Sequence, residues 1–82
     1  MDEIAQPARI LVVDDDPDTV LILSRHLQRE GFVPIEANSG AACLKIVQDR
    51  DVDVILLDLM MPEMDGFEVC KRLKDNPGTA EI

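Results

Sequence analysis

An apolar run that closes on a single carboxylate constrains the fold of this chain more than any other feature. Residues 52–57 are aliphatic except at Asp53, the run ends at Asp58, and Pro62 and Gly66 follow shortly afterwards. Short aliphatic runs followed by turn residues are typical of strands buried in a parallel sheet. Because α/β proteins bind ligands beyond the carboxyl ends of such strands, the pattern predicts an α/β fold with Asp58 at the binding edge.

A second apolar run carries the same signal. Residues 10–13 are four consecutive aliphatic residues, and Asp14, Asp15 and Asp16 follow them. If this strand lies beside the one that ends at Asp58, the acidic groups meet at one edge of the sheet. Clustered carboxylates need a counter-charge, and carboxylate oxygens are the ligands that Mg²⁺ prefers. The two runs therefore predict an acidic pocket for a hard cation, with Asp16 serving as a helix cap instead.

The rest of the chain alternates between strand and helix patterns, which implies right-handed crossovers and a parallel sheet. Strands are expected over 9–13, 32–36 and 52–57, with Pro34 typical of a sheet edge, and residues 80–82 are expected to open another. Helices are expected over 17–30, 40–49 and 66–74, capped by Asp16, Ser39 and Asp65. The inward positions are expected to be Val20, Leu23, Leu27, Cys43, Leu44, Val47, Phe67, Cys70 and Leu73.

Composition excludes several classes of protein. The 82 residues include 8 basic and 17 acidic ones, a net charge of −9, which argues against binding to nucleic acid or to an anionic membrane surface. No apolar stretch approaches the roughly 20 residues of a membrane span, and the acidic N-terminus does not resemble a signal peptide. We therefore expect a cytoplasmic protein in which Cys43 and Cys70 are reduced thiols at buried helix positions.

Two motifs give the chain a family resemblance. Leu-Val-Val-Asp-Asp-Asp at 11–16 and Asp-Leu-Met-Met-Pro-Glu-Met-Asp-Gly at 58–66 resemble those of the receiver domain of two-component response regulators, the chemotaxis-regulator type. The resemblance implies a flavodoxin-like, doubly wound parallel sheet, of which only the first three β/α units are present, in strand order 2-1-3. It divides the chain into an N-terminal leader, 1–8, and a partial receiver domain, 9–82.

The resemblance also implies a role for each acidic residue. Asp58 would accept a phosphoryl group from a phosphohistidine of a sensor histidine kinase or phosphotransfer protein, in a phosphorelay. Mg²⁺ would be bound directly by Asp15, Asp58 and the backbone carbonyl of Met60, and mainly through water by Asp14. The chain would then be a signalling domain and not an enzyme.

The resemblance further implies that part of the family domain is missing from this chain. The chain stops where the fourth strand of the family would begin, without the Ser/Thr and Lys of the later strands, so phosphorylation is expected to be slow or absent. The third strand would become an apolar edge, which favours a rearranged fold or self-association through that strand. One alternative is a dimerisation or docking module without phosphotransfer. An aspartyl phosphatase is disfavoured because Met60 stands where such enzymes have a second acid.

Overall fold

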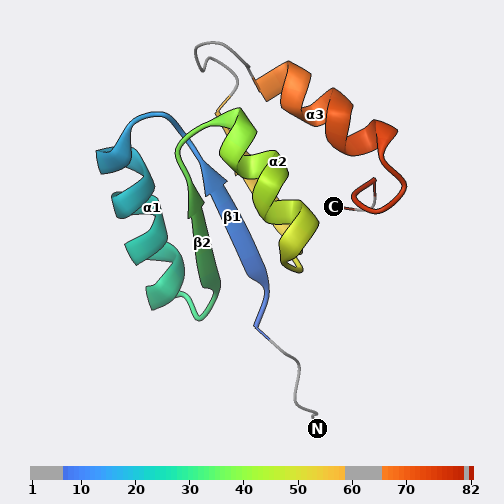
Figure 1. The fold of residues 1–82 in the computed structure, drawn as a ribbon. Helices are drawn as coiled ribbons and strands as arrows, with labels where there is room; N and C mark the ends of the chain where they lie inside the picture. Colours follow the sequence, from blue (N-terminus) through green and yellow to red (C-terminus); the bar gives the residue numbers. More distant parts are fainter. Residues whose placement is uncertain (1–6, 59–65, 81) are drawn as a thin grey trace, which may run out of the picture.

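The computed structural model describes residues 7–58, 66–80 and 82, and it contains three strands that alternate with three helices (Figure 1). The strands are β1 (Arg9–Val13), β2 (Val33–Ala37) and β3 (Val54–Leu57). The helices are α1 (Pro17–Arg29), α2 (Gly40–Asp49) and α3 (Gly66–Asp75). The Met60 and Asp65 predictions and most of the 1–8 leader lie outside the described residues.

The three strands form one parallel sheet in the order β2-β1-β3, as predicted. On one side of β1, Arg9 is opposite Val33 and Val13 is opposite Ala37. On the other side, Ile10 is opposite Val54. The central position of β1 explains its burial, since every residue from Ile10 to Val13 is at most 7% exposed. Pro34 lies in the edge strand β2, where a missing N–H is tolerated.

Helices cover both faces of this sheet, with α1 on one side and α2 and α3 on the other (Figure 1). The main core lies on the side of α2 and α3. Its buried members are Leu11, Val13, Ile35, Ala37, Cys43, Val52, Val69 and Leu73. Burial of Cys43 raises the pKa of its thiol to about 11, so this cysteine acts as a small apolar side chain.

Local chemistry fixes where the first two helices begin. The Asp16 side chain accepts a hydrogen bond from the Asp18 N–H, and Pro17 occupies the first helical position of α1. The Ser39 hydroxyl accepts one from the Ala42 N–H at the start of α2. Both caps were predicted from the sequence, and the structure confirms them.

Strands β2 and β3 differ from the prediction in their bounds, since β2 is shifted by one residue to 33–37 and β3 begins two residues later than expected. The Phe32 N–H donates to the Leu27 carbonyl, so Phe32 completes the end of α1, and β2 begins one residue later than expected. Gly31 has a φ of 91° in this turn, which suits glycine. The β3 ladder begins at Val54, although Val52 still packs into the core.

Several predictions about the C-terminal third are wrong. Phe67 is 66% exposed and Cys70 is exposed, whereas Val69 is fully buried. The reason is that Phe67 and Cys70 line an open groove beside β3, beyond which the described chain supplies no further strand. Ala80 lies in a turn instead of opening a strand, and the Thr79 hydroxyl donates to the Leu73 carbonyl there.

Ser24 was not predicted to be inward, yet it is 4% exposed on the buried face of α1, and its hydroxyl has no hydrogen-bond partner among the residues that the structure describes. Replacing Ser24 by Ala is expected to raise the free energy of unfolding by about 1 kcal/mol, because an unsatisfied buried hydroxyl is removed and alanine favours helix. Urea unfolding would measure the change. Ser39→Ala, which removes a cap, should instead lower stability by about 1 kcal/mol. A destabilised Ser24→Ala variant would contradict the assignment.

The amino ends of β1 and β3 are joined by a polar contact. The Arg9 N–H donates to Asp53 Oδ2 at 2.7 Å, the Asp53 N–H donates to the Arg9 carbonyl at 2.9 Å, and the Arg9 guanidinium lies 3.5 Å from the same carboxylate. The hydrogen bond from the Arg9 amide, aided by the arginine's charge, holds the pKa of Asp53 below its usual 3.8 against a smaller opposing effect of desolvation.

This lowered pKa predicts a pH dependence of stability. Ionised Asp53 stabilises the fold above its usual pKa of 3.8, and this contribution is lost as the pH falls through the lower pKa of the folded state. We therefore expect wild type to exceed Asp53→Asn in urea midpoint at pH 7 and the difference to shrink below about pH 4. A difference that is constant from pH 7 to pH 3 would contradict this.

In the parts of the chain that the structure describes, no helix is long and apolar enough to cross a membrane.

Candidate metal centre

Three carboxylates meet at the carboxyl ends of β1 and β3. One ligand oxygen from each of Asp14, Asp15 and Asp58 lies within 4.8 Å of the others. The chain runs from β1 to β2 on one side and then crosses to β3 on the other, so the strand order reverses between β1 and β3. Such a reversal is where α/β sheets open a crevice for ligands. The juxtaposition predicted from the two apolar runs is therefore confirmed.

The backbones of Asp14 and Asp58, each one residue past the end of a strand, are still hydrogen-bonded to the neighbouring strand. The Asp58 N–H donates to the Val13 carbonyl at 2.9 Å, and the Asp14 N–H donates to the Ala37 carbonyl at 3.2 Å. Both side chains are half-buried, whereas Asp15 is exposed. Asp14 and Asp58 thus project from fixed backbone, and Asp15 is the most accessible of the three.

Asp16, the third acid after β1, is used differently. Its Oδ1 accepts a hydrogen bond from the Asp18 N–H and its Oδ2 one from the Thr19 hydroxyl, both at 3.0 Å. Both carboxylate oxygens therefore face the start of α1. The prediction that Asp16 is a cap is confirmed. The hydrogen bond from the Thr19 hydroxyl was not predicted, although the sequence shows a threonine three residues after the capping aspartate.

The donor set fits a small, hard cation. All three side chains offer carboxylate oxygens, the ligand type that Mg²⁺ takes. Two oxygens bound on opposite sides of Mg²⁺ would be about 4.2 Å apart, so a spacing within 4.8 Å is close to that of ligands of one ion. The negative charges at this edge also favour a cation, since three carboxylates repel one another at this range.

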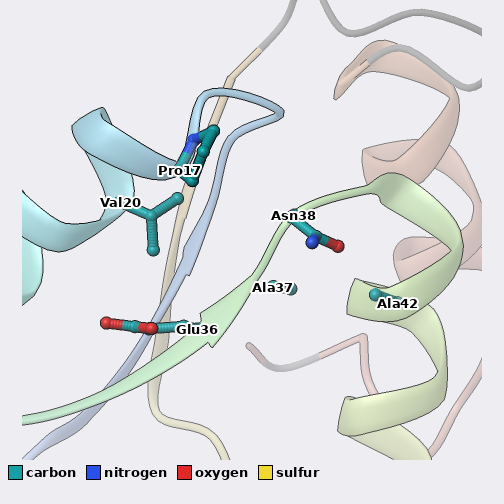
Figure 2. Close-up of a pocket in the computed structure, with 6 residues that line it drawn as sticks. All are labelled: Pro17, Val20, Glu36, Ala37, Asn38 and Ala42. Carbon is teal, nitrogen blue, oxygen red and sulfur yellow. The ribbon is translucent and has the colours of Figure 1, made fainter.

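A separate pocket of about 270 Å³ lies between the first turns of α1 and α2, on the β2 side of the sheet (Figure 2). Figure 2 shows Pro17 and Val20 on its α1 wall, with Glu36 and Asn38 as its polar lining. None of the three clustered carboxylates lines the pocket. The acidic site is therefore the open edge between β1 and β3 and is distinct from this hollow.

Comparison with known proteins assigns the family. Residues 10–82 match the family model of the response regulator receiver domain. The chain belongs to the response regulator receiver domain family. This receiver domain is 44% identical over 66 residues to the alkaline phosphatase synthesis transcriptional regulatory protein PhoP of Bacillus subtilis. It is 47% identical over 75 residues to the response regulator PleD of Caulobacter vibrioides.

Solved receiver structures have the same fold. The N-terminal domain of a response regulator receiver protein from Methanoculleus marisnigri superposes with a TM-score of 0.88 at 44% identity over 90% of this chain. The response regulator TrrA of Thermotoga maritima, solved in complex with Mg²⁺ and BeF, superposes with a TM-score of 0.80 at 37% identity over 83% of this chain.

The receiver domain described here is shorter than these proteins. The matched regions span 28% of the length of PhoP and 16% of that of PleD, from 80% and 92% of this chain. They span 60% of the M. marisnigri chain and 59% of the TrrA chain. The family match over residues 10–82 contains all three clustered carboxylates of this chain, while the activities of the whole relatives belong to those proteins.

Proposed function

We propose that this receiver domain accepts a phosphoryl group on Asp58, with Mg²⁺ held by Asp14, Asp15 and Asp58. The observation that carries the proposal is the convergence of these carboxylates within 4.8 Å in a chain of this family. The backbone carbonyl of Met60, outside the described residues, is proposed as a further oxygen ligand. The TrrA structure supports the choice of metal, since that relative was solved with Mg²⁺ and BeF.

Asp58 suits the role of nucleophile because its backbone is fixed to β1 and its carboxylate is half-buried at the open edge. One of its oxygens attacks the phosphorus of a phosphohistidine, the P–N bond breaks, and the electron pair of that bond stays on the departing imidazole. Bound Mg²⁺ would neutralise charge on the transferring group. Asp15, and Asp14 mainly through water, would hold the ion beside the acceptor.

The proposed partner is a sensor histidine kinase or a phosphotransfer protein, and the proposed compartment is the cytoplasm. Kinase partners follow from the family, and the net charge of −9 supports a receiver that does not itself bind nucleic acid. The domain is proposed to serve as a phosphoacceptor signalling domain in a two-component system, and its partner supplies the phosphohistidine.

Intact-mass spectrometry tests this function directly. The folded chain is incubated with a small acyl phosphate in the presence of Mg²⁺ and, in parallel, with excess EDTA. We expect one phosphoryl group to be added slowly with Mg²⁺ and at least 10-fold less adduct with EDTA, because the metal offsets charge in the transition state. A folded, Mg²⁺-binding chain that forms no adduct would contradict phosphoacceptance and support the docking alternative.

A second candidate function, self-association, is favoured by the surface of β3. This strand is an edge in the described sheet, and Val54 and Leu56 are 45% and 40% exposed. A groove of about 520 Å³ runs beside it, lined by Asp53, Val54, Ile55, Leu57, Phe67, Cys70, Leu73, Lys74 and Ile82. An exposed apolar edge favours pairing with another strand. We propose a second copy of this chain as the partner.

Charge restricts how two copies could pair. If two β3 strands lay antiparallel and centred on the strand, Asp53 of each copy would be opposite Asp58 of the other, and like charges directly opposite destabilise a sheet. A register shifted by one residue avoids this contact. Association is therefore expected to strengthen with salt, which screens the acidic surfaces.

Sedimentation velocity would measure this association. Leu56→Lys is expected to weaken dimerisation at least 10-fold, because a lysine on an edge strand opposes pairing. Ile22→Lys on α1, where the side chain is 67% exposed, is the matched control and should leave the dimer intact. A wild-type chain that stays monomeric at high concentration and high salt would overturn the second candidate.

A further inference from the structure

The loop between β1 and α1 links the start of the helix to the acidic cluster through one residue. The backbone N–H of Asp16 donates to Asp14 Oδ1 at 3.0 Å. The side chain of the same residue accepts hydrogen bonds from Asp18 and Thr19, and its carbonyl accepts one from the Val20 N–H at 3.2 Å. Asp16 therefore contacts the candidate ligand on one side and the first turn of α1 on the other.

These contacts fix the direction of the Asp16 N–H. The residue has φ −94° and ψ 109°, an extended conformation that the capping bonds and the following Pro17 both favour. The N–H consequently points at Asp14 and occupies one of its two carboxylate oxygens. The same Asp14 carboxylate contributes an oxygen to the cluster formed with Asp15 and Asp58.

We propose that Asp16 is a positioning residue for the metal site. Its side chain does not bind the cation; it anchors the loop on α1 so that its own amide orients Asp14 before the ion arrives. This inference rests on the proposed function only in taking Mg²⁺ as the ion that the cluster binds. Residues that orient metal ligands typically change metal affinity by about 10- to 100-fold when removed.

Two substitutions of Asp16 distinguish an effect of the loop geometry from an effect of the side-chain charge. Asp16→Asn loses the negative charge but keeps a side-chain acceptor for the Asp18 N–H and a polar partner for Thr19, and asparagine caps helices as well as aspartate does. Asp16→Ala loses both the charge and the cap. If Asp16 acts through geometry, only the alanine variant weakens Mg²⁺ binding; if it acts through charge, both variants do.

Isothermal titration with Mg²⁺ distinguishes these cases on the folded chain. We expect Asp16→Ala to weaken binding about 10-fold and Asp16→Asn to stay within about 2-fold of wild type. Equal losses in both variants, or no loss in either, would overturn the proposal. Thr19→Val, which removes one of the two capping bonds, is expected to weaken binding about 2- to 3-fold and serves if Asp16→Ala does not fold. An unchanged affinity in Thr19→Val would then overturn it.

A metal-free readout keeps the inference separate from the proposed function. Amide hydrogen exchange at residue 16 reports the bond to Asp14 without any ion. Protection should fall about 10-fold or more in Asp16→Ala and in Asp14→Ala and persist in Asp16→Asn, whether or not the chain binds Mg²⁺. If wild type binds no Mg²⁺ yet shows this pattern, the positioning role stands and the metal assignment fails. Protection that is unchanged in Asp16→Ala would overturn the positioning role.

Discussion

Replacing Asp58 by Asn is expected to abolish phosphoryl transfer to this chain, lowering the rate of adduct formation from an acyl phosphate by at least 100-fold. The neutral amide is a far weaker nucleophile than the carboxylate, and the change also removes one of the three charges that converge within 4.8 Å. Intact-mass spectrometry of the chain, followed by peptide mapping of any residual adduct, would measure the effect.

Asp53→Asn is the matched control. It makes the same change from carboxylate to amide, but at the residue just before β3 instead of the residue just after it. Its carboxylate contacts Arg9 and lies outside the acidic cluster. The control should therefore be phosphorylated at the wild-type rate at pH 7. An adduct that persists in Asp58→Asn would assign the acceptor to another residue, Asp14 or Asp15 being the nearest.

The second large effect is a loss of stability expected from truncating a side chain in the central strand, β1. Leu11→Ala is expected to lower the free energy of unfolding by about 3 to 4 kcal/mol, because Leu11 is fully buried in the central strand and the truncation leaves a cavity. A domain of this size is stable by only about 5 to 10 kcal/mol, so the variant is expected to be substantially unfolded in low urea. Circular dichroism during urea titration would measure the loss.

Ile22→Ala is the matched control for Leu11→Ala. It also truncates an aliphatic side chain, but Ile22 is 67% exposed on α1. Its effect is expected to stay within about 0.5 kcal/mol. Similar losses in both variants would show that α1 buries Ile22 in solution, for example in a dimer, and would contradict the packing described for the single chain.

Much of the first half of this fold follows from local signals in the sequence. The bounds of β1 and of α2 were predicted correctly because an uninterrupted aliphatic run marks the strand and Ser39 marks the helix start. The meeting of Asp14, Asp15 and Asp58 was also predicted, since it requires only that β1 lie beside β3. Strand ends and caps are local features, and a short sequence window contains them.

The orientation of α3 did not follow from local signals. Phe67, Cys70 and Leu73 have helical spacing, yet only Leu73 is buried, and Val69 takes the place expected of Phe67. Periodicity gives the width of an apolar stripe but not which part of it faces the core, because that depends on how far the sheet extends beneath the helix. Ser24 was missed for a related reason: close packing of α1 on the sheet decides its burial, and its polarity does not reveal it.

The position of β1 in the sheet has a consequence for synthesis of the chain on the ribosome. Of the three described strands β1 is translated first, but it pairs with β2 and β3, and its first residue is hydrogen-bonded to Asp53, 44 residues further along. This strand, the most buried of the sheet, therefore has both edges unpaired until β2 has been translated and one edge unpaired until β3 has. During that interval residues 10–13 are an exposed apolar segment of the nascent chain, which is prone to aggregation and suited to chaperone binding.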